Sequence, residues 1–126
     1  MKDRLNEGVV GDTAKLMMHR LIVRRLRHDP SLVEKAKEAH TRQADQFDGW
    51  PFVREWQKLL ALPTGELASR LISRDREMVM LRNSSPFYLV EGVHFGDYDA
   101  RVRLRRAARR IVERGLSARS PSSRGP

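Results

Sequence analysis

An apolar surface that runs most of the way around one predicted helix, at positions 13–28, is the feature that most limits the fold of this chain. It leaves one narrow polar stripe of arginines, Arg20, Arg24 and Arg27. A helix that is apolar on most sides needs other elements to cover it, so we expect it at the centre of the fold. Asp12 should cap its start, and Asp29-Pro30 should end it, because the residue before proline avoids the helical conformation. Residues 1–11 are expected to be a frayed lead-in.

Four more helices are predicted before the pattern breaks. They should cover residues 32–44, 51–60, 66–72 and 74–82. Ser31 with Glu34 has the spacing of a capping box at the start of the second helix, and Ser73 can cap the fifth. The second helix is mostly polar, which favours a surface position.

The segment that follows is not helical in pattern. Residues 83–86 read Asn-Ser-Ser-Pro, and a β-biased run follows them. This run fits a hairpin or an extended apolar strap near residues 84–96, and we expect the strap because a lone hairpin is marginal in water. Asp97 should then cap a last helix over 98–114, with Gly115 ending it and a disordered basic tail over 117–126. The predicted fold is all-α, a compact single-domain bundle of about five to six helices over residues 1–116.

Composition limits the classes of protein to which the chain can belong. With 126 residues, of which 40% are hydrophobic, it can bury one core but not two ordinary domains. The absence of cysteine excludes disulfides, zinc ribbons and thiol nucleophiles. No apolar stretch approaches the length of a membrane span, and no apolar leader core is present at the start, so a cytoplasmic protein without a membrane partner is expected.

Positive charge is concentrated at the C-terminal end. Residues 100–126 contain nine arginines and one acid, Glu113, whereas the net charge of the whole chain is +9. In a helical projection of residues 98–114, aliphatic residues share one arc and arginines fill most of the rest. We therefore expect an anionic partner, either nucleic acid or an acidic protein surface, to bind this face. The candidate residues are Arg101, Arg103, Arg105, Arg106, Arg109, Arg110 and Arg114.

A second set of candidates is apolar. The methionines of the first helix and the aromatic residues around the third could anchor a protein partner or a homodimer, because one small domain has difficulty covering so much apolar surface. These candidates are Met17, Met18, Trp50, Phe52 and Trp56.

No pattern typical of an enzyme or a metal site is found in the sequence. The four histidines, His19, His28, His40 and His94, lack metal-ligand spacing, Ser84 and Ser85 lie in no nucleophile elbow, and no glycine-rich phosphate loop is present. We expect no catalytic residue, metal or cofactor. A helix-turn-helix around 28–31 is disfavoured, because the helix after it has balanced charge.

Residues 81–87 read Leu-Arg-Asn-Ser-Ser-Pro-Phe, and with the segment before them they resemble short uncharacterised bacterial helical proteins that contain an L-R-x-S-S-P-F segment. The resemblance covers residues 50–90, and some of these proteins look like antitoxins of toxin–antitoxin systems. It implies no catalytic residue. Together with the charge pattern, it leads us to expect a non-enzymatic, antitoxin-like regulator with a protein partner such as a cognate toxin. The alternative is a nucleic-acid-binding protein that uses the last helix.

Overall fold

The computed structural model describes residues 6–90 and 97–123, with the side chains of the last helix described as far as residue 116. The described part of the chain is all-α, as predicted, and contains no strand. In chain order its elements are α1 (Glu7–His28), α2 (Ser31–Gln46), α3 (Pro51–Leu60), α4 (Thr64–Leu71), α5 (Arg76–Leu81), the 3-10 turns η1 (Arg82–Ser84) and η2 (Pro86–Leu89), and α6 (Tyr98–Ser123).

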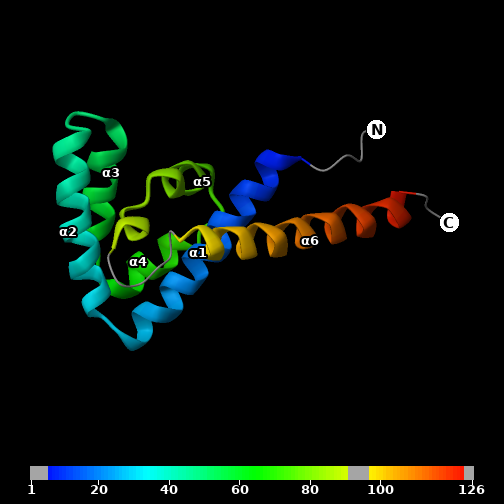
Figure 1. Cartoon of the computed structure of the whole chain (residues 1–126), viewed down its shortest axis with the longest axis horizontal. Coiled ribbons are helices and arrows are strands. Elements are labelled where there is room, and N and C mark those ends of the chain that lie inside the picture. The colour runs from blue at the N-terminus through cyan, green and yellow to red at the C-terminus, as the bar shows by residue number, and fades with distance from the viewer. Residues whose placement is uncertain (1–5, 91–96, 124–126) are drawn as a thin grey trace.

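Helix α1 is the central element, as expected from its apolar circumference. It contacts α2, α4, η1 and α6, and Figure 1 shows these elements placed around it. Its buried side chains include Ile22, Val23 and Leu26, which belong to one continuous core together with residues of every other helix of the body. The prediction that the most apolar helix would be covered on several sides is therefore confirmed.

The predicted start of α1 is wrong. The helix begins at Glu7, and the Asn6 side chain accepts hydrogen bonds from the amides of the next turn at 2.8 and 3.3 Å. The two glycines that suggested fraying lie inside the helix, and Val10 between them is fully buried. A good cap and the burial of Val10 thus outweigh the roughly 1 kcal/mol that each glycine costs in a helix.

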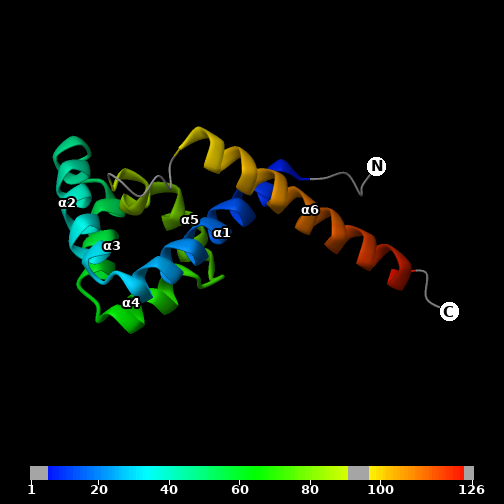
Figure 2. The same cartoon turned by 60° about the horizontal axis from the view of Figure 1, so that its bottom comes forward.

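Helices α2 and α3 form an antiparallel pair on one side of α1 (Figure 2). The residues of α2 that could face inward do so, and Leu32, Val33 and Ala36 are buried. The predicted capping box is absent, because Asp29 accepts hydrogen bonds from both the amide and the hydroxyl of Ser31. Asp29 therefore accepts hydrogen bonds just before the helix, and Ser31 is the first residue of α2 rather than its cap.

Trp56 lies at the centre of the body. Its ring is fully buried, meets Phe87 edge-to-face at 6.4 Å, and donates a hydrogen bond from Nε1 to the Leu81 carbonyl at 3.0 Å.

The helix containing Leu81, α5, begins at Arg76 after Asp75, whose side chain accepts from the Met78 amide. The predicted cap at Ser73 is therefore wrong.

The described part of the predicted strap is not extended. Two 3-10 turns, η1 and η2, replace it, and η2 packs against α2. Phe87 and Val90 are buried, so the segment does cover the helices as an apolar strap would. Residues 91–96 lie outside the described residues.

Helix α6 is longer than predicted. It passes the expected end at Arg114 and the glycine beyond it, and is helical as far as Ser123, where the sequence predicted a disordered tail. Residues 124–126 lie outside the described part. Figures 1 and 2 show α6 running back along the first half of α1 and then extending beyond the body.

Candidate functional site

Contact between α6 and α1 is apolar at its centre and is the most extensive contact between two helices in the described part of the chain. Ala108 is fully buried, and Leu104 packs on the edge of the core. Further along the predicted aliphatic strip, Ile111 is 45% exposed. The expected aliphatic strip is therefore covered at Ala108 and only partly covered further along, where Ile111 is exposed and Val112 is half-buried.

One acid, Glu7, fixes two of the seven predicted partner-binding arginines. Its carboxylate accepts from Arg105 at 2.8 Å and from Arg109 at 2.6 and 3.0 Å. Hydrogen bonds from Arg109, which has the larger effect, and from Arg105 lower the pKa of Glu7. The hydrogen bond between Arg109 and Glu7 also raises the pKa of Arg109. Arg105 and Arg109 thus bind within the chain and attach α6 to the first turn of α1. The prediction that these two arginines bind an anionic partner loses its basis, because Glu7 of the same chain pairs with both.

Gly11 lies beside this attachment. A Cβ atom at this position would lie 3.3 Å from Nη1 of Arg105, closer than nearly all real contacts of that kind. The absence of a side chain lets the guanidinium of Arg105 pass close to the surface of α1 on its way to Glu7. The glycine that suggested fraying in the sequence is therefore a point where the Arg105 side chain approaches α1 closely.

The other five arginines of the predicted set are exposed, and among the described residues none of them forms an ion pair. At 100° per residue, four of them fall within an arc of about 80° centred nearly opposite the buried Ala108. With a rise of 1.5 Å per residue they span about 16 Å of helix. We call these four the arginine stripe: Arg103, Arg106, Arg110 and Arg114.

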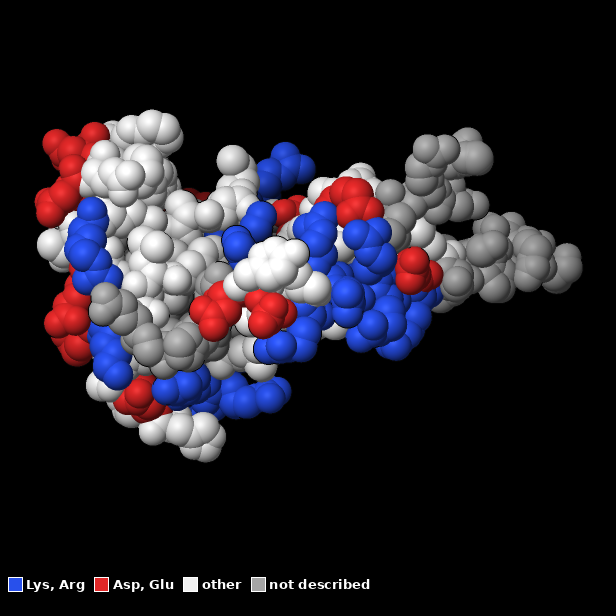
Figure 3. Space-filling view, in the orientation of Figure 1, with Lys and Arg blue, Asp and Glu red and all other residues white. Residues whose placement is uncertain are grey.

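Figure 3 shows the resulting distribution of charge. Lys and Arg side chains gather over α6, whereas acidic and basic residues alternate over the α2 end of the molecule. Asp99 and Glu113 lie on the same side of α6 as the stripe in projection, so the stripe is a cationic face with an acid near each end. Arg101 projects instead toward the body and lines a cavity there.

The apolar interface candidates separate into two groups. Trp56 and Met18 are buried in the core, which makes them unavailable to a partner, and Met17 is half-buried. Trp50 is 57% exposed and meets Phe47 and Phe52 edge-to-face at 5.5 and 5.8 Å, at the turn between α2 and α3. The structure thus leaves one exposed aromatic cluster, made of Phe47, Trp50 and Phe52.

His19 is a buried structural residue. Its Nδ1 lies 2.8 Å from the Lys15 carbonyl and therefore donates to it, which leaves Nε2 to accept from the Ser85 hydroxyl at 2.9 Å. Burial lowers the pKa of His19 to about 4, and the nearby Arg82 guanidinium adds to this effect. The histidine is thus neutral at physiological pH and fixes the turn between η1 and η2.

Arg82 completes this polar network. It is 2% exposed and donates to the carbonyls of Leu71 and Ser73 at 3.1 and 2.7 Å, and its own carbonyl accepts from the Tyr88 hydroxyl at 2.8 Å. Burial lowers the pKa of this guanidinium from its ordinary value. The segment at 81–87 is therefore bonded to α3 through the Leu81 carbonyl and to the end of α4 through the Arg82 guanidinium.

His40 is also engaged, through Nε2 and the Val53 carbonyl at 2.8 Å. Among the described residues no group of three or more His, Asp or Glu side chains could hold a metal ion, and no helix there is long and apolar enough to cross a membrane. His94 lies outside the described residues.

Comparisons with protein-family models, curated proteins and solved structures found no match for this chain.

Sequence reasoning missed Glu7, because this residue was placed in a frayed lead-in. Asn6 followed by an acid is a normal start signal for a helix, so the signal was present. The pairing of Glu7 with residues about one hundred positions later depends on the tertiary fold. No local pattern gives it.

Proposed function

We propose that this protein is a non-enzymatic binding protein whose arginine stripe holds the phosphate backbone of a nucleic acid. The observation that supports this is the stripe itself, four exposed guanidiniums on one face of one helix, directed away from the body. Arginine binds phosphate through two parallel N–H groups, and a duplex presents one charge about every 1.7 Å along its axis. A stripe about 16 Å long can thus contact several phosphates at once.

The composition of the stripe favours phosphate over an acidic protein. Protein interfaces usually have an apolar or aromatic centre that supplies most of the affinity. Apart from the arginines, the face that projects with the stripe contains Asp99 and Glu113 but no apolar residue as far as Arg114. Binding should therefore depend on charge and show little preference for base sequence.

A regulator of antitoxin type, with a protein partner, is the second candidate function. The exposed aromatic cluster favours it, because a half-exposed tryptophan held by two phenylalanines is a typical anchor for a protein interface. The turn between α2 and α3, which carries the cluster, lies at the far end of the molecule from most of α6, which carries the stripe (Figure 1). A protein partner such as a toxin at the cluster is therefore compatible with nucleic acid at α6.

Fluorescence anisotropy with a labelled duplex of arbitrary sequence at low salt tests the proposed function. The purified protein should bind the duplex, and changing all four stripe arginines to Gln should weaken binding by about a hundredfold or more, since each phosphate contact contributes.

A matched control loses the same charge elsewhere. It replaces four exposed arginines of the body by Gln, namely Arg20, Arg24, Arg54 and Arg76. If overall charge alone drives binding, both variants will lose affinity equally, and the assignment to α6 is wrong. If the unaltered protein does not retain the duplex even at low salt, nucleic acid is not the partner, and the aromatic cluster becomes the leading site.

A further inference from the structure

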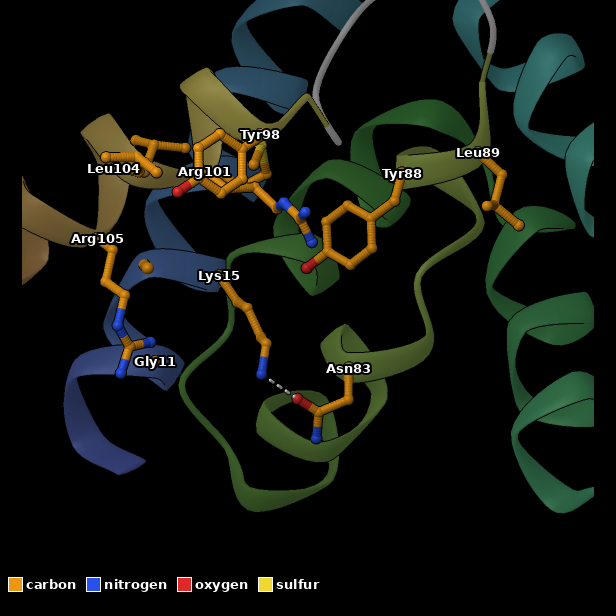
Figure 4. Close-up of a pocket in the computed structure, with 12 residues that line it drawn as sticks. Gly11, Lys15, Asn83, Tyr88, Leu89, Tyr98, Arg101, Leu104 and Arg105 are labelled. Atoms are coloured by element: carbon orange, nitrogen blue, oxygen red, sulfur yellow. Dashed lines mark hydrogen bonds between the residues drawn. The ribbon is translucent and has the colours of Figure 1, made fainter. Parts of the chain in front are cut away.

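A cavity of about 650 Å³ lies between α1, α6 and the η1–η2 segment, on the side of α6 that faces the body. Figure 4 shows its lining residues: Lys15 and Gly11 come from α1, Tyr98, Arg101, Leu104 and Arg105 from α6, and Asn83, Tyr88 and Leu89 from the turns. This volume lies within the range of about 300 to 1,000 Å³ that is common for small-molecule sites. The arginine stripe takes no part in the cavity.

The charge of the cavity is one-sided. Three cationic side chains line it, and none of its described lining residues is acidic. Arg105 is paired with Glu7, but the Lys15 ammonium donates at 2.6 Å to a neutral amide oxygen, that of Asn83. The Arg101 guanidinium has no ion pair or hydrogen bond with any residue that the structure describes, and only the backbone amide of Arg101 is bonded, to the Asp97 carbonyl. Two cations therefore share a cavity in which no described lining residue supplies a counter-charge.

The remaining lining is apolar and aromatic. Ala14, Met18, Val102 and Leu104 contribute aliphatic surface. Tyr88 uses its hydroxyl on the Arg82 carbonyl, which leaves its ring for the cavity. At the mouth, Tyr98 is 72% exposed and Leu89 is 47% exposed. Large apolar side chains that face solvent beside a cavity are typical of a site that a ligand covers.

We propose that this cavity binds a small organic acid, a carboxylate joined to an apolar or aromatic body. The carboxylate binds Arg101 from α6 and Lys15 from α1, two cationic side chains that line the cavity (Figure 4). A carboxylate accepts two hydrogen bonds from a guanidinium and further ones from an ammonium, and these charge-assisted bonds are the stronger kind. The apolar body contacts Met18, Tyr88 and Tyr98.

Isothermal titration calorimetry with phenylbutyrate and with its neutral analogue phenylbutanol tests this site. The two probes share one apolar body and differ in the anionic group. Phenylbutyrate should bind, with an affinity at least about tenfold higher than that of phenylbutanol, because the alcohol cannot pair with the two cations. Arg101→Met should remove about tenfold or more of the phenylbutyrate affinity and leave phenylbutanol unaffected.

Arg110→Met is the matched control, because it removes the same charge from the outer face of the same helix and should leave both affinities unchanged. Circular dichroism of each variant checks that the fold is kept, and chemical-shift changes of the Tyr88 and Tyr98 rings in the unaltered protein provide a readout that needs no variant. Equal affinity for acid and alcohol, or equal loss in Arg101→Met and Arg110→Met, would overturn the proposal. So would the absence of any shift change at the two tyrosines.

Discussion

Acid should destabilise this protein through one buried histidine, and His19→Gln should remove that sensitivity. His19 is fully buried, and its pKa is lowered to about 4 from 6.5 because burial disfavours the imidazolium. The unfolded chain therefore takes up a proton at a higher pH than the folded chain does. The stability that neutral His19 supports is fully present above pH 6.5 and is lost as the pH falls from 6.5 toward 4.

The two pKa values set the size of the effect. One pH unit corresponds to about 1.36 kcal/mol, and linkage between 6.5 and about 4 gives a loss of about 2.5 kcal/mol of unfolding free energy on going from pH 7.5 to 4.5. The carboxylates of Glu7 and Asp75 also have lowered pKa values. Their effect on the free energy of unfolding falls mainly below the pH range of this comparison, where they protonate in the unfolded chain. Comparison of two proteins at the same pH values removes their contribution.

Urea unfolding at pH 7.5 and 4.5, followed by far-UV circular dichroism, measures this loss. His19→Gln should be the less stable protein at pH 7.5, because Gln cannot reproduce both hydrogen bonds of the ring, and the gap to the unaltered protein should shrink by about 2.5 kcal/mol at pH 4.5. His28→Gln, at the exposed end of α1, is the control and should lose stability in parallel with the unaltered protein. A gap for His19→Gln that is the same at both pH values would refute the reasoning, as would an NMR titration of the His19 ring with a midpoint above 6.

Trp56→Ala should lower the free energy of unfolding by about 3 to 5 kcal/mol, because it removes a fully buried indole from the centre of the core. The same urea assay measures this, and a loss below about 1 kcal/mol would contradict the placement of Trp56. Glu7→Gln should release the two arginines that it holds and loosen the first turn of α1, which faster hydrogen exchange at the Val10 amide would report. Glu34→Gln, on exposed α2, is the control for charge loss, and unchanged exchange in Glu7→Gln would show that the pairing does not hold the turn.

Helix positions and the identity of the central helix could be predicted from the sequence, because periodic burial is a local signal. The apolar circumference of 13–28 predicted a covered helix, and α1 is covered by four other elements. The predicted ends were less accurate wherever tertiary contacts outweighed local preference. Burial of Val10 extends α1 past two glycines, and α6 continues through Gly115 to Ser123.

The candidate site was predictable in part. From the sequence, seven arginines were assigned to the side of the last helix away from its aliphatic strip, and four of these form the stripe, whereas Arg101 projects about 20° from Ala108 on the side that faces the body. The projection could not show that Glu7 would neutralise Arg105 and Arg109, since this pairing joins opposite ends of the chain. It also could not show that Arg101 would face a cavity, because the other walls come from α1 and the η turns.

The dependence of duplex binding on salt is the most direct test of the central claim that the arginine stripe contacts phosphate. Each phosphate that is neutralised on a duplex contributes about 0.9 to the slope of log affinity against log salt concentration, so four contacts predict a slope near −3.6. Changing Arg106 alone to Gln should bring the slope to about −2.7 and weaken binding of every duplex sequence alike. A slope that is the same in Arg106→Gln as in the unaltered protein would contradict the account.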